Sequence, residues 1–435
     1  MKPGMIRVVH EGTKEFDSER VRLIQRGTSD FEAVEPAVRE TLSEVRRGGD
    51  QAVLRWIERF ESRRPAVLFS REYDGAGALG RLAPDLRDAL ELATERIVRY
   101  HEHQLTQGFR YEEDGVRLGM RVRPLARVGV YAPGGKARYP SSVLMSAAPA
   151  RVAGVREIVL ATPAPNDLLL AAAHLAGVTA ILDAGGAQAI GALAFGTETV
   201  PKVDKIVGPG NRYVACAKRL VFGEVGIDGI AGPSEILVLC DDSANAAWIA
   251  ADLLSQAEHD EAAYPLCITT SAVLAARIAT EVDAQLATLP RKDIAERAIT
   301  DNGAILVVGS REGMTALADV IASEHLALHV RQPEELFDRV GAAGAAFVGP
   351  DTPEAAGDYL AGPSHVLPTG GAVRYGSPLG VYDFVARTSY IQYEPAALRT
   401  QAKAIAVLAR AEGLEAHARA TEQRSSGPAL RNRRS

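Results

Sequence analysis

Apolar residues follow two different patterns along this chain. Residues 30–60 and 84–107 place apolar side chains three and four positions apart among charged ones, which predicts amphipathic helices that cover a core. Pro84 and Asp85 make a favourable helix start, because proline is tolerated in the first turn and aspartate suits the positive end of the helix dipole. From residue 127 onward, short β-rich apolar runs alternate with alanine-rich helical stretches.

This alternation predicts parallel sheets covered by helices. The first series of strands is expected at 128–131, 157–162, 180–183 and 205–207, with helices at 141–153, 167–176, 187–195 and 212–222. A second series of strands is expected at 235–240, 265–269, 304–308, 326–330 and 345–348, with helices near 244–258, 272–289 and 312–321. We therefore expect an α/β fold with two incomplete Rossmann-like parallel-sheet lobes, an N-terminal helical segment and a short C-terminal helical domain.

The expected domain borders follow these changes of pattern. Residues 1–126 form the N-terminal helical region, packed with the second α/β lobe; the lobes are 127–234 and 235–379, and a C-terminal segment spans 380–435. That last segment is too short to bury a core of its own, so it must pack on the main body or on a second subunit. Its polar, basic end is expected to be disordered.

Composition narrows the class of protein. The chain has 435 residues with 47% apolar and 24% charged residues, and its net charge of −6 comes from charges of both signs scattered along it. This disfavours a nucleic-acid binder, which should carry a basic face. The most apolar stretch, 168–182, is too short to span a membrane, and the first residues lack a signal-peptide pattern. Three cysteines far apart form neither a disulfide framework nor a structural zinc site, so a reduced cytoplasmic location is expected.

Three glycine-rich segments are candidates for a nucleotide site. They lie at 129–136, 183–191 and 207–213, where a predicted strand ends and a helix is about to begin. Ligands of open α/β sheets bind at this carboxyl edge, and Tyr131, Gln188 and Asn211 could supply ring and hydrogen-bond contacts. Tight turns with no ligand explain the same glycines equally well. The literal Gly-x-Gly-x-x-Gly at 75–80 follows a polar segment rather than a strand, so we expect a surface turn there.

Several polar pairs could bind a metal. Gln256 and His259 are three residues apart at the end of a predicted helix, hence on one face, and zinc accepts mixed nitrogen and oxygen ligands. Further candidates lie in loop-rich surroundings: Asp358 with His365, and Glu412 with His417.

The remaining histidines are weaker candidates for a functional site. His325 and His329 have the spacing of a zinc hydrolase motif, but they lie on or next to a strand, so they cannot converge as helical ligands do. We expect His329 to be structural, His174 to be half-buried, and His101 and His103 to be solvated.

Many long segments of the chain resemble the signature blocks of the histidinol dehydrogenase family, in that family's order from about residue 120 to 420. They include YAPGGKARYPSSV, DAGGAQAIGALAFGTE, GIAGPSEILV, ADLLSQAEHD, GDYLAGPSHVLPTGG, SPLGVYDFVARTS and AEGLEAHA. The departures are small: Ser364 stands where the family commonly has asparagine, and Ser323 where proline is usual. Neither departure removes a chemical group that the mechanism needs.

This resemblance implies a zinc-dependent enzyme that oxidises L-histidinol to L-histidine with two NAD⁺, in an intertwined homodimer with shared active sites and one Zn²⁺ per subunit. The implied roles, carried over position by position, are zinc ligands Gln256, His259, Asp358 and His417, acid/base residues Glu324 and His325, substrate contacts Ser234, Glu412 and His365, and NAD contacts Tyr131, Gln188 and Asn211. The zinc ligands and His325 would also surround the substrate, and His417 would come from the neighbouring subunit.

The implied chemistry suits these residue types. A neutral imidazole is a suitable base for the hydroxyl proton in the first oxidation, which favours His325, and Glu324 is a reasonable base for water in the second. Alternatives remain: a related NAD and zinc dehydrogenase acting on another polar alcohol such as a sulfonated diol, a zinc hydrolase, or a non-catalytic nucleotide-binding protein.

Overall fold

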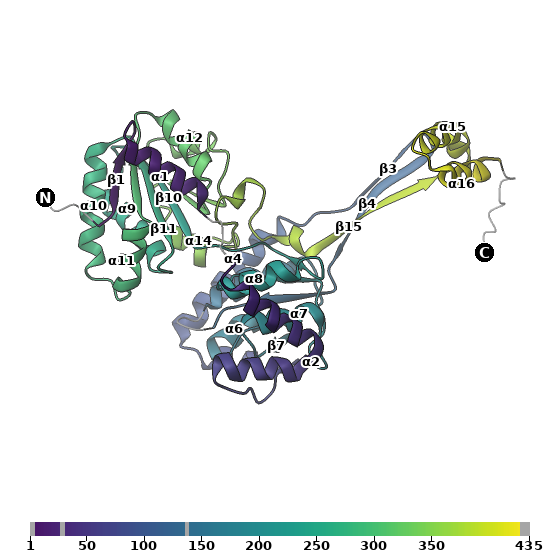
Figure 1. The fold of residues 1–435 in the computed structure, drawn as a ribbon, viewed down its shortest axis with the longest axis horizontal. Helices are drawn as coiled ribbons and strands as arrows, with labels where there is room; N and C mark the ends of the chain where they lie inside the picture. Colours follow the sequence, from purple (N-terminus) through teal and green to yellow (C-terminus); the bar gives the residue numbers. More distant parts are fainter. Residues whose placement is uncertain (1–4, 27–30, 135–138, 427–435) are drawn as a thin grey trace. The chain divides into compact units, whose positions relative to one another are not determined.

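A computed structural model describes residues 5–26, 31–134 and 139–426 (Figure 1). The chain divides into two compact units. The main unit consists of residues 1–104 and 125–384, and the C-terminal unit consists of residues 105–124 and 385–435. Among the described helices, none combines the length and the apolar character that crossing a membrane requires.

The first lobe of the main unit is built on a six-stranded sheet. Its strand order is β2-β7-β6-β5-β8-β9, and all neighbours are parallel except β2 and β7. The strands are β2 (Phe69–Ser70), β5 (Arg127–Tyr131), β6 (Glu157–Ala161), β7 (Ala180–Leu182), β8 (Lys205–Val207) and β9 (Gly226–Ile227). The chain builds outward from β5 on one side and then resumes with β8 on the other, so the topological switch point lies between β5 and β8.

Helices cover both faces of this sheet. On one face lie α2 (Glu35–Glu61), α7 (Gly186–Phe195) and α8 (Arg212–Val221); on the other lie α3 (Gly75–Arg81), α4 (Pro84–Glu102), α5 (Pro140–Val152) and α6 (Asp167–Ala176). Asn166 and Asn211 cap α6 and α8 with their side-chain oxygens, which explains why these helices begin where they do.

The second lobe contains an all-parallel sheet with the strand order β1-β12-β11-β10-β13-β14. The strands are β1 (Arg7–His10), β10 (Glu235–Cys240), β11 (Tyr264–Thr269), β12 (Ala304–Val307), β13 (His325–His329) and β14 (Ala345–Val348). As in the first lobe, the first strand of the series is central, so both lobes have the strand order expected of Rossmann-like folds.

Two apolar clusters fill the faces of this second sheet. One lies under α9 (Ala246–Ala257), α10 (Ala272–Leu286) and α11 (Lys292–Asp301), and the other under α1 (Lys14–Gln25), α12 (Arg311–Ile321) and α13 (Pro333–Phe337). The short helix α14 (Glu354–Tyr359) and the 3₁₀ turns η1 (Ala372–Arg374) and η2 (Val381–Phe384) follow β14.

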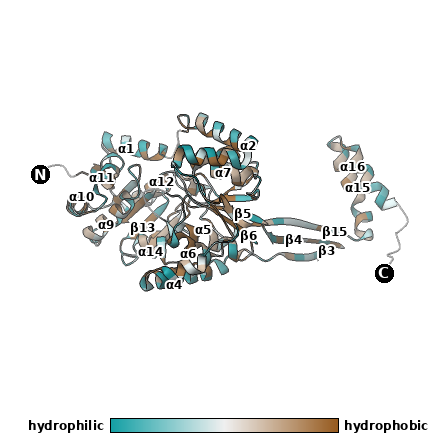
Figure 2. Cartoon of the chain, turned by 90° about the horizontal axis from the view of Figure 1, so that it is seen from below, coloured by the Kyte–Doolittle hydropathy of each residue, from teal (hydrophilic) through white to brown (hydrophobic). Residues whose placement is uncertain are grey.

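The C-terminal unit combines an antiparallel sheet with a helix pair. The sheet has the order β15-β4-β3, formed by β3 (Phe109–Glu113), β4 (Val116–Pro124) and β15 (Val385–Tyr393). The helices α15 (Pro395–Ala411) and α16 (Glu415–Ser426) pack on each other through Ala406, Ala409 and Ala418. Figure 2 shows brown and teal residues side by side along both helices.

The α/β fold with two parallel-sheet lobes is confirmed, whereas the course of the N-terminal segment differs from our expectation. Residues 1–126 do not form one helical region on the second lobe. Among the described helices and strands of this region, only β1 and α1 join that lobe, because the strand RVVH extends its sheet beside β12. The helices α2 to α4 cover the first lobe, and β3 and β4 belong to the C-terminal unit, whose border falls at residue 385 rather than 380.

Candidate active site

The carboxyl edge of the first sheet brings the three predicted nucleotide contacts to the ends of β5, β7 and β8. Tyr131 ends β5, is 3% exposed, and its hydroxyl accepts a hydrogen bond from the Gly186 N–H at 3.1 Å. Burial raises the pKa of Tyr131 to about 12, so its hydroxyl stays protonated. Gln188 is buried on the first turn of α7, and its Oε1 has no hydrogen-bond partner among the described residues.

A buried ion pair holds the turn that follows β8. Gly208 adopts φ +107°, and a side chain there would collide with the Tyr131 carbonyl. Its N–H donates to Asp228 Oδ2 at 2.7 Å, and its carbonyl accepts from Lys218 Nζ at 3.0 Å, while Lys218 and Asp228 pair with each other. Asn211 then starts α8, accepting from the N–H groups of Tyr213 and Val214. The turn is therefore fixed before any ligand arrives.

Two other glycine-rich segments differ from this turn. The end of the predicted segment 129–136, with Gly135 and Lys136, lies outside the described residues. The Gly-x-Gly-x-x-Gly at 75–80 forms α3 rather than the surface turn we predicted, because Asp74 caps it through the Gly77 N–H.

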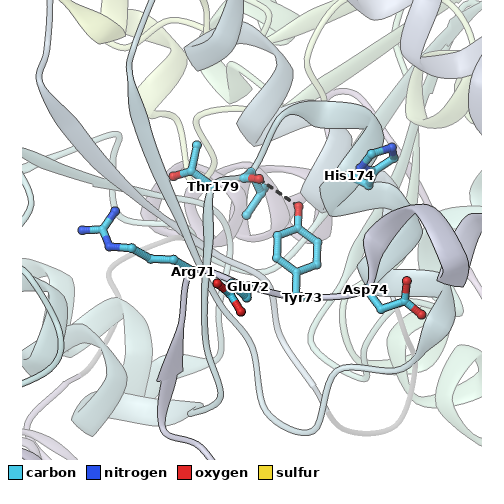
Figure 3. A pocket seen from close by; sticks show the side chains of 7 residues that line it. Arg71, Glu72, Tyr73, Asp74, His174 and Thr179 are labelled. Atoms are coloured by element: carbon cyan, nitrogen blue, oxygen red, sulfur yellow. Dashed lines mark hydrogen bonds between the residues drawn. The ribbon is translucent and has the colours of Figure 1, made fainter.

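A pocket lies beside α3, away from the predicted site residues. It is lined by Arg71, Glu72, Tyr73, Asp74, His174, Val178 and Thr179 (Figure 3). The Tyr73 hydroxyl donates to the Val178 carbonyl at 2.8 Å, and Arg71 pairs with Glu157. Asp74 likewise pairs with Arg81. Because these polar groups already have partners within the chain, the pocket does not carry the signature of a ligand site.

The predicted acid/base residues lie at the start of β13, on the amino edge of the second sheet. Glu324 and His325 are both buried there. Glu324 Oε2 accepts from the Glu235 N–H at 2.9 Å, and His325 Nδ1 lies 2.8 Å from the Glu235 carbonyl oxygen. A carbonyl oxygen can only accept, so Nδ1 carries the ring proton and Nε2 is left as the basic nitrogen of the neutral imidazole.

Burial shifts the pKa values of this pair in opposite directions. It lowers the pKa of His325 to about 4, which keeps the imidazole neutral at pH 7. It raises the pKa of Glu324 well above the usual value, and the nearby carboxylates of Glu235, Asp358 and Glu354 add to this effect. At neutral pH the pair therefore provides one neutral imidazole base and one carboxyl group that tends to keep its proton.

Three further predicted residues surround His325. Asp358, on α14, lies 3.4 Å from His365 Nδ1. Burial alone would raise the pKa of Asp358, but His365, His325 and His259 together lower it to about 2. Because these groups shift one another's pKa values, the four side chains lie near one another, with Asp358 on a short helix rather than in the loop we expected.

Gln256 is the polar side chain in this region that most needs a partner. It is fully buried on the last turn of α9, and neither its Oε1 nor its Nε2 has a hydrogen-bond partner among the described residues. A buried amide without partners costs about 1–3 kcal/mol. His259 follows in the turn after α9, where its N–H donates to the Gln256 carbonyl. A metal ion beside Gln256 and His259 would give the buried amide a partner and remove this cost. These residues therefore fit a metal site.

Glu354 joins the cluster, although the sequence did not point to it. His325, Glu354 and Asp358 each offer a ligand atom within 4.8 Å of the others, and Glu354 Oε1 lies 3.7 Å from His325 Nε2. Burial, followed by the Asp358 charge, raises the pKa of Glu354 to about 8. With no cation bound, Glu354 keeps its proton at neutral pH while Asp358 is ionised, which favours Asp358 of these two carboxyls as the metal ligand.

The other predicted substrate contacts are divided between the two units. Ser234 precedes β10 at the same amino edge, and its carbonyl accepts from the Tyr264 N–H. The Ser364 hydroxyl donates to the Met145 carbonyl of α5 at 3.0 Å, which ties the loop that carries His365 to the first lobe. Glu412, at the end of α15, and His417, on α16, belong to the C-terminal unit and are exposed there.

Two predictions for other histidines are wrong. His101 is buried rather than solvated, and its Nδ1 lies 2.8 Å from the Ile97 carbonyl oxygen. It continues the buried face formed by Leu90, Thr94 and Ile97, a spacing that could have identified it. His174 is exposed rather than half-buried. His329 is buried next to Asp252, in keeping with a structural role.

Sequence reasoning also missed Arg26 and Glu235, which lie directly behind Glu324 and His325. Glu235 is the only acidic residue in the apolar run EILVLC, and a charge at the start of a fully buried strand is a usable signal. Nothing in the sequence around Arg26 indicates its position.

Comparisons with known proteins show the family of this chain. A family model described as histidinol dehydrogenase matches residues 24–425. Proteins named histidinol dehydrogenase are 48% identical in Dechloromonas aromatica, covering 94% of this chain and 96% of the relative, and 50% identical in Geobacter sulfurreducens, covering 94% and 97%.

A solved structure supports the same relationship. The crystal structure of histidinol dehydrogenase from Elizabethkingia anophelis is similar with a TM-score of 0.91 at 34% identity, covering 97% of this chain and 98% of that one. Since the family model, the relatives and the solved structure all span nearly the whole chain, this protein belongs to the histidinol dehydrogenase family.

Proposed function

We propose that this protein oxidises L-histidinol to L-histidine with two NAD⁺ and a bound Zn²⁺, the last step of L-histidine biosynthesis. The observation that carries the proposal is the amino edge of the second sheet. A neutral His325 with its basic Nε2 unprotonated lies there beside Glu324. Around them lie Asp358, His365 and His259, with the unpartnered Gln256 next to His259.

The zinc ligands in this proposal are Gln256, His259 and Asp358, with His417 from a second copy of the chain. The buried, unpartnered amide of Gln256 and the low pKa of Asp358 support the first three, because a cation needs oxygen and nitrogen donors that are free and unprotonated. When bound, zinc performs no redox chemistry and holds nitrogen and oxygen groups of a substrate by Lewis-acid attraction.

The first oxidation needs a base for the alcohol proton. His325 Nε2 takes this proton while the carbinol carbon gives a hydride to NAD⁺, so the alcohol loses two electrons and two hydrogens and becomes the aldehyde histidinal. His325 can act in this way at neutral pH because it is neutral, and the hydrogen bond from Nδ1 to the Glu235 carbonyl keeps its ring oriented.

The second oxidation needs water. Glu324, once ionised, takes a proton from the water that adds to the aldehyde carbonyl, and the resulting hydrate gives a hydride to a second NAD⁺, leaving a carboxylic acid. A carboxyl group with a raised pKa suits proton transfer near neutral pH better than an ordinary glutamate. NAD⁺ is proposed to bind along Tyr131, Gln188 and Asn211 at the carboxyl edge of the first sheet, next to its switch point.

We further propose a homodimer in which Glu412 and His417 complete the partner's site, with Ser234 and His365 contacting substrate from the first chain. The C-terminal unit supports this proposal, because its small alanine cluster leaves Phe109, Ile391, Val407 and Leu408 more than half exposed. Exposed apolar side chains of this kind are typical of protein interfaces. A cytoplasmic location is proposed as well, since all three cysteines are free and buried.

Metal analysis tests the ligand set. We expect His259→Asn and Asp358→Ala each to lose most of the zinc that the purified wild-type protein carries, and turnover to fall with it, because each removes a ligand. Glu354→Gln is the matched control, since it alters a carboxyl in the same cluster that is not a proposed ligand. Full zinc in either ligand variant, or zinc lost only from Glu354→Gln, would exclude the proposed set.

A further inference from the structure

The carboxylate of Glu235 is the most completely hydrogen-bonded acidic group beside the candidate site. Glu235 is 1% exposed. Arg26 donates to it twice, from Nε to Oε1 at 3.0 Å and from Nη2 to Oε2 at 2.7 Å. The Gly370 N–H donates to Oε1 at 2.9 Å, and the Glu324 N–H donates to Oε2 at 3.2 Å. Four donors therefore fix this side chain from three separate segments of the chain.

The main chain of Glu235 in turn contacts both acid/base residues. Its N–H donates to Glu324 Oε2 at 2.9 Å, and its carbonyl accepts from His325 Nδ1 at 2.8 Å. Glu235 and Glu324 thus form two reciprocal hydrogen bonds, in which the backbone N–H of each residue donates to a carboxyl oxygen of the other. A rotation of Glu235 would therefore change both the orientation of the Glu324 carboxyl and the position of the proton on the His325 ring.

Arg26 extends this connection to the residues before Glu324. Arg26 follows the end of α1, and its side chain is 1% exposed. Besides Glu235, it donates to the Leu23 carbonyl at 2.7 Å and contacts the Ala322 carbonyl at 3.4 Å. Ala322 has the unusual φ of +51° at the turn from α12 toward β13. The guanidinium thus connects the end of α1 to the turn that immediately precedes Glu324 and His325.

Stability alone does not explain such a pair. Burying two charges costs desolvation energy that their attraction hardly exceeds, so an apolar pair of similar volume would hold the same elements as well. What an apolar pair could not do is accept from the Glu324 N–H and keep the Glu235 backbone in place against His325. These directional hydrogen bonds therefore indicate that the pair orients Glu324 and His325.

We propose that Arg26 and Glu235 are positioning residues, which hold the carboxyl of Glu324 and fix His325 with its proton on Nδ1. The inference rests on the proposed roles of Glu324 and His325. It assigns a role in catalysis to two residues that touch neither substrate nor cofactor in that proposal.

The kinetic test compares Glu235→Gln, Arg26→Gln and the double variant. Each single change leaves a buried partner without its opposite charge, whereas the double variant restores a neutral pair. We expect each single variant to lower kcat about 10- to 100-fold, as lost supporting contacts do. The KM for NAD⁺ should stay within about twofold and zinc content should be unchanged. The double variant should recover part of kcat, because amides of both side chains can still hydrogen-bond.

Glu19→Gln is the matched control. Glu19 lies on α1, is 8% exposed and pairs with Arg22 and Arg7, but it contacts neither Glu324 nor His325. Its loss should lower the melting temperature while kcat stays within about twofold. If Glu235→Gln behaves as Glu19→Gln does, with a lower melting temperature and an unchanged kcat, the positioning role is wrong.

Nitrogen NMR of the protein labelled with ¹⁵N-histidine tests the inference without any activity measurement, and His325→Asn assigns the signal. We expect His325 to carry a slowly exchanging proton on Nδ1 in the wild type and to lose this preference in Glu235→Gln. An unchanged ring signal in folded Glu235→Gln or Arg26→Gln would overturn the proposal. If the ring signal changes but the wild type does not oxidise L-histidinol, the proposed function fails and the positioning role stands.

Discussion

At the scale of single residues, burial determines the chemistry of Glu324 and His325. The same low-polarity surroundings make His325 a neutral base and make Glu324 hold its proton. Sequence identified both residues through the family resemblance and favoured a neutral His325, but it did not indicate the raised pKa of Glu324. Arg26 and Glu354 were missed because their contacts depend on segments that are distant in sequence: Arg26 lies 209 residues from Glu235.

A stability measurement tests the state of Glu324. Because its folded-state pKa is raised, the folded protein holds a proton that the unfolded chain releases above about pH 4.5. Stability is therefore lost as pH rises from that value toward the folded-state pKa, by at most about 1.4 kcal/mol per pH unit. Glu324→Gln removes this loss and keeps an oxygen that can accept from the Glu235 N–H.

In chelator-treated protein, the melting temperature of Glu324→Gln minus that of the wild type should increase between pH 5 and pH 8. Scanning calorimetry at both pH values measures this difference. A difference that is independent of pH would mean that Glu324 ionises at an ordinary pKa.

At the scale of elements, the strands β5 to β8 and β10 to β14 were predictable, since their apolar runs are mostly buried and bounded by turns. The strands β1, β2 and β9 are short and only partly buried, and they were not predicted. The predicted strand 235–240 agrees with β10 (Glu235–Cys240) at both ends, and the predicted strand 205–207 agrees with β8 (Lys205–Val207). The strands β3 (FRYEE) and β15 (VARTSYIQY) were not predictable in this way, because they are largely exposed and have no continuous apolar run. The expectation of a carboxyl edge concerned the nucleotide site alone, and no sheet edge was predicted for the acid/base residues, which lie at the start of β13.

The position of α14 depends on a glycine. A Cβ on Gly357 would lie 2.6 Å from the ring of Phe347 on β14, so Gly357→Ala must displace α14, which carries Asp358, or the Phe347 ring, which packs on His325. We expect this variant to bind zinc at least about tenfold more weakly, as measured by competition with a chelator. Gly80→Ala in α3 is the control, because its Cβ meets nothing within 4 Å, and its zinc affinity should not change. Equal affinities in the two variants would show that α14 does not need this close approach.

At the scale of the whole molecule, the proposed dimer makes each active site from two chains. Mixing the inactive variants His325→Ala and His417→Ala should then restore activity. Random reassortment puts about half of the dimers in the mixed form, and each mixed dimer has one intact site of two, so recovery should approach roughly a quarter of wild-type activity. No recovery after verified subunit exchange would assign His417 to its own chain.

The central claim is that one site carries out both oxidations, and the number of NADH molecules formed per L-histidinol consumed tests it most directly. Complete conversion of a limiting amount of L-histidinol, followed by NADH absorbance and by quantifying histidine and histidinal, gives this ratio. The adjacent Glu324 and His325 predict two NADH per L-histidinol, with histidine as the product and little free histidinal. A ratio of one with histidinal released, or no NADH at all, would contradict the account.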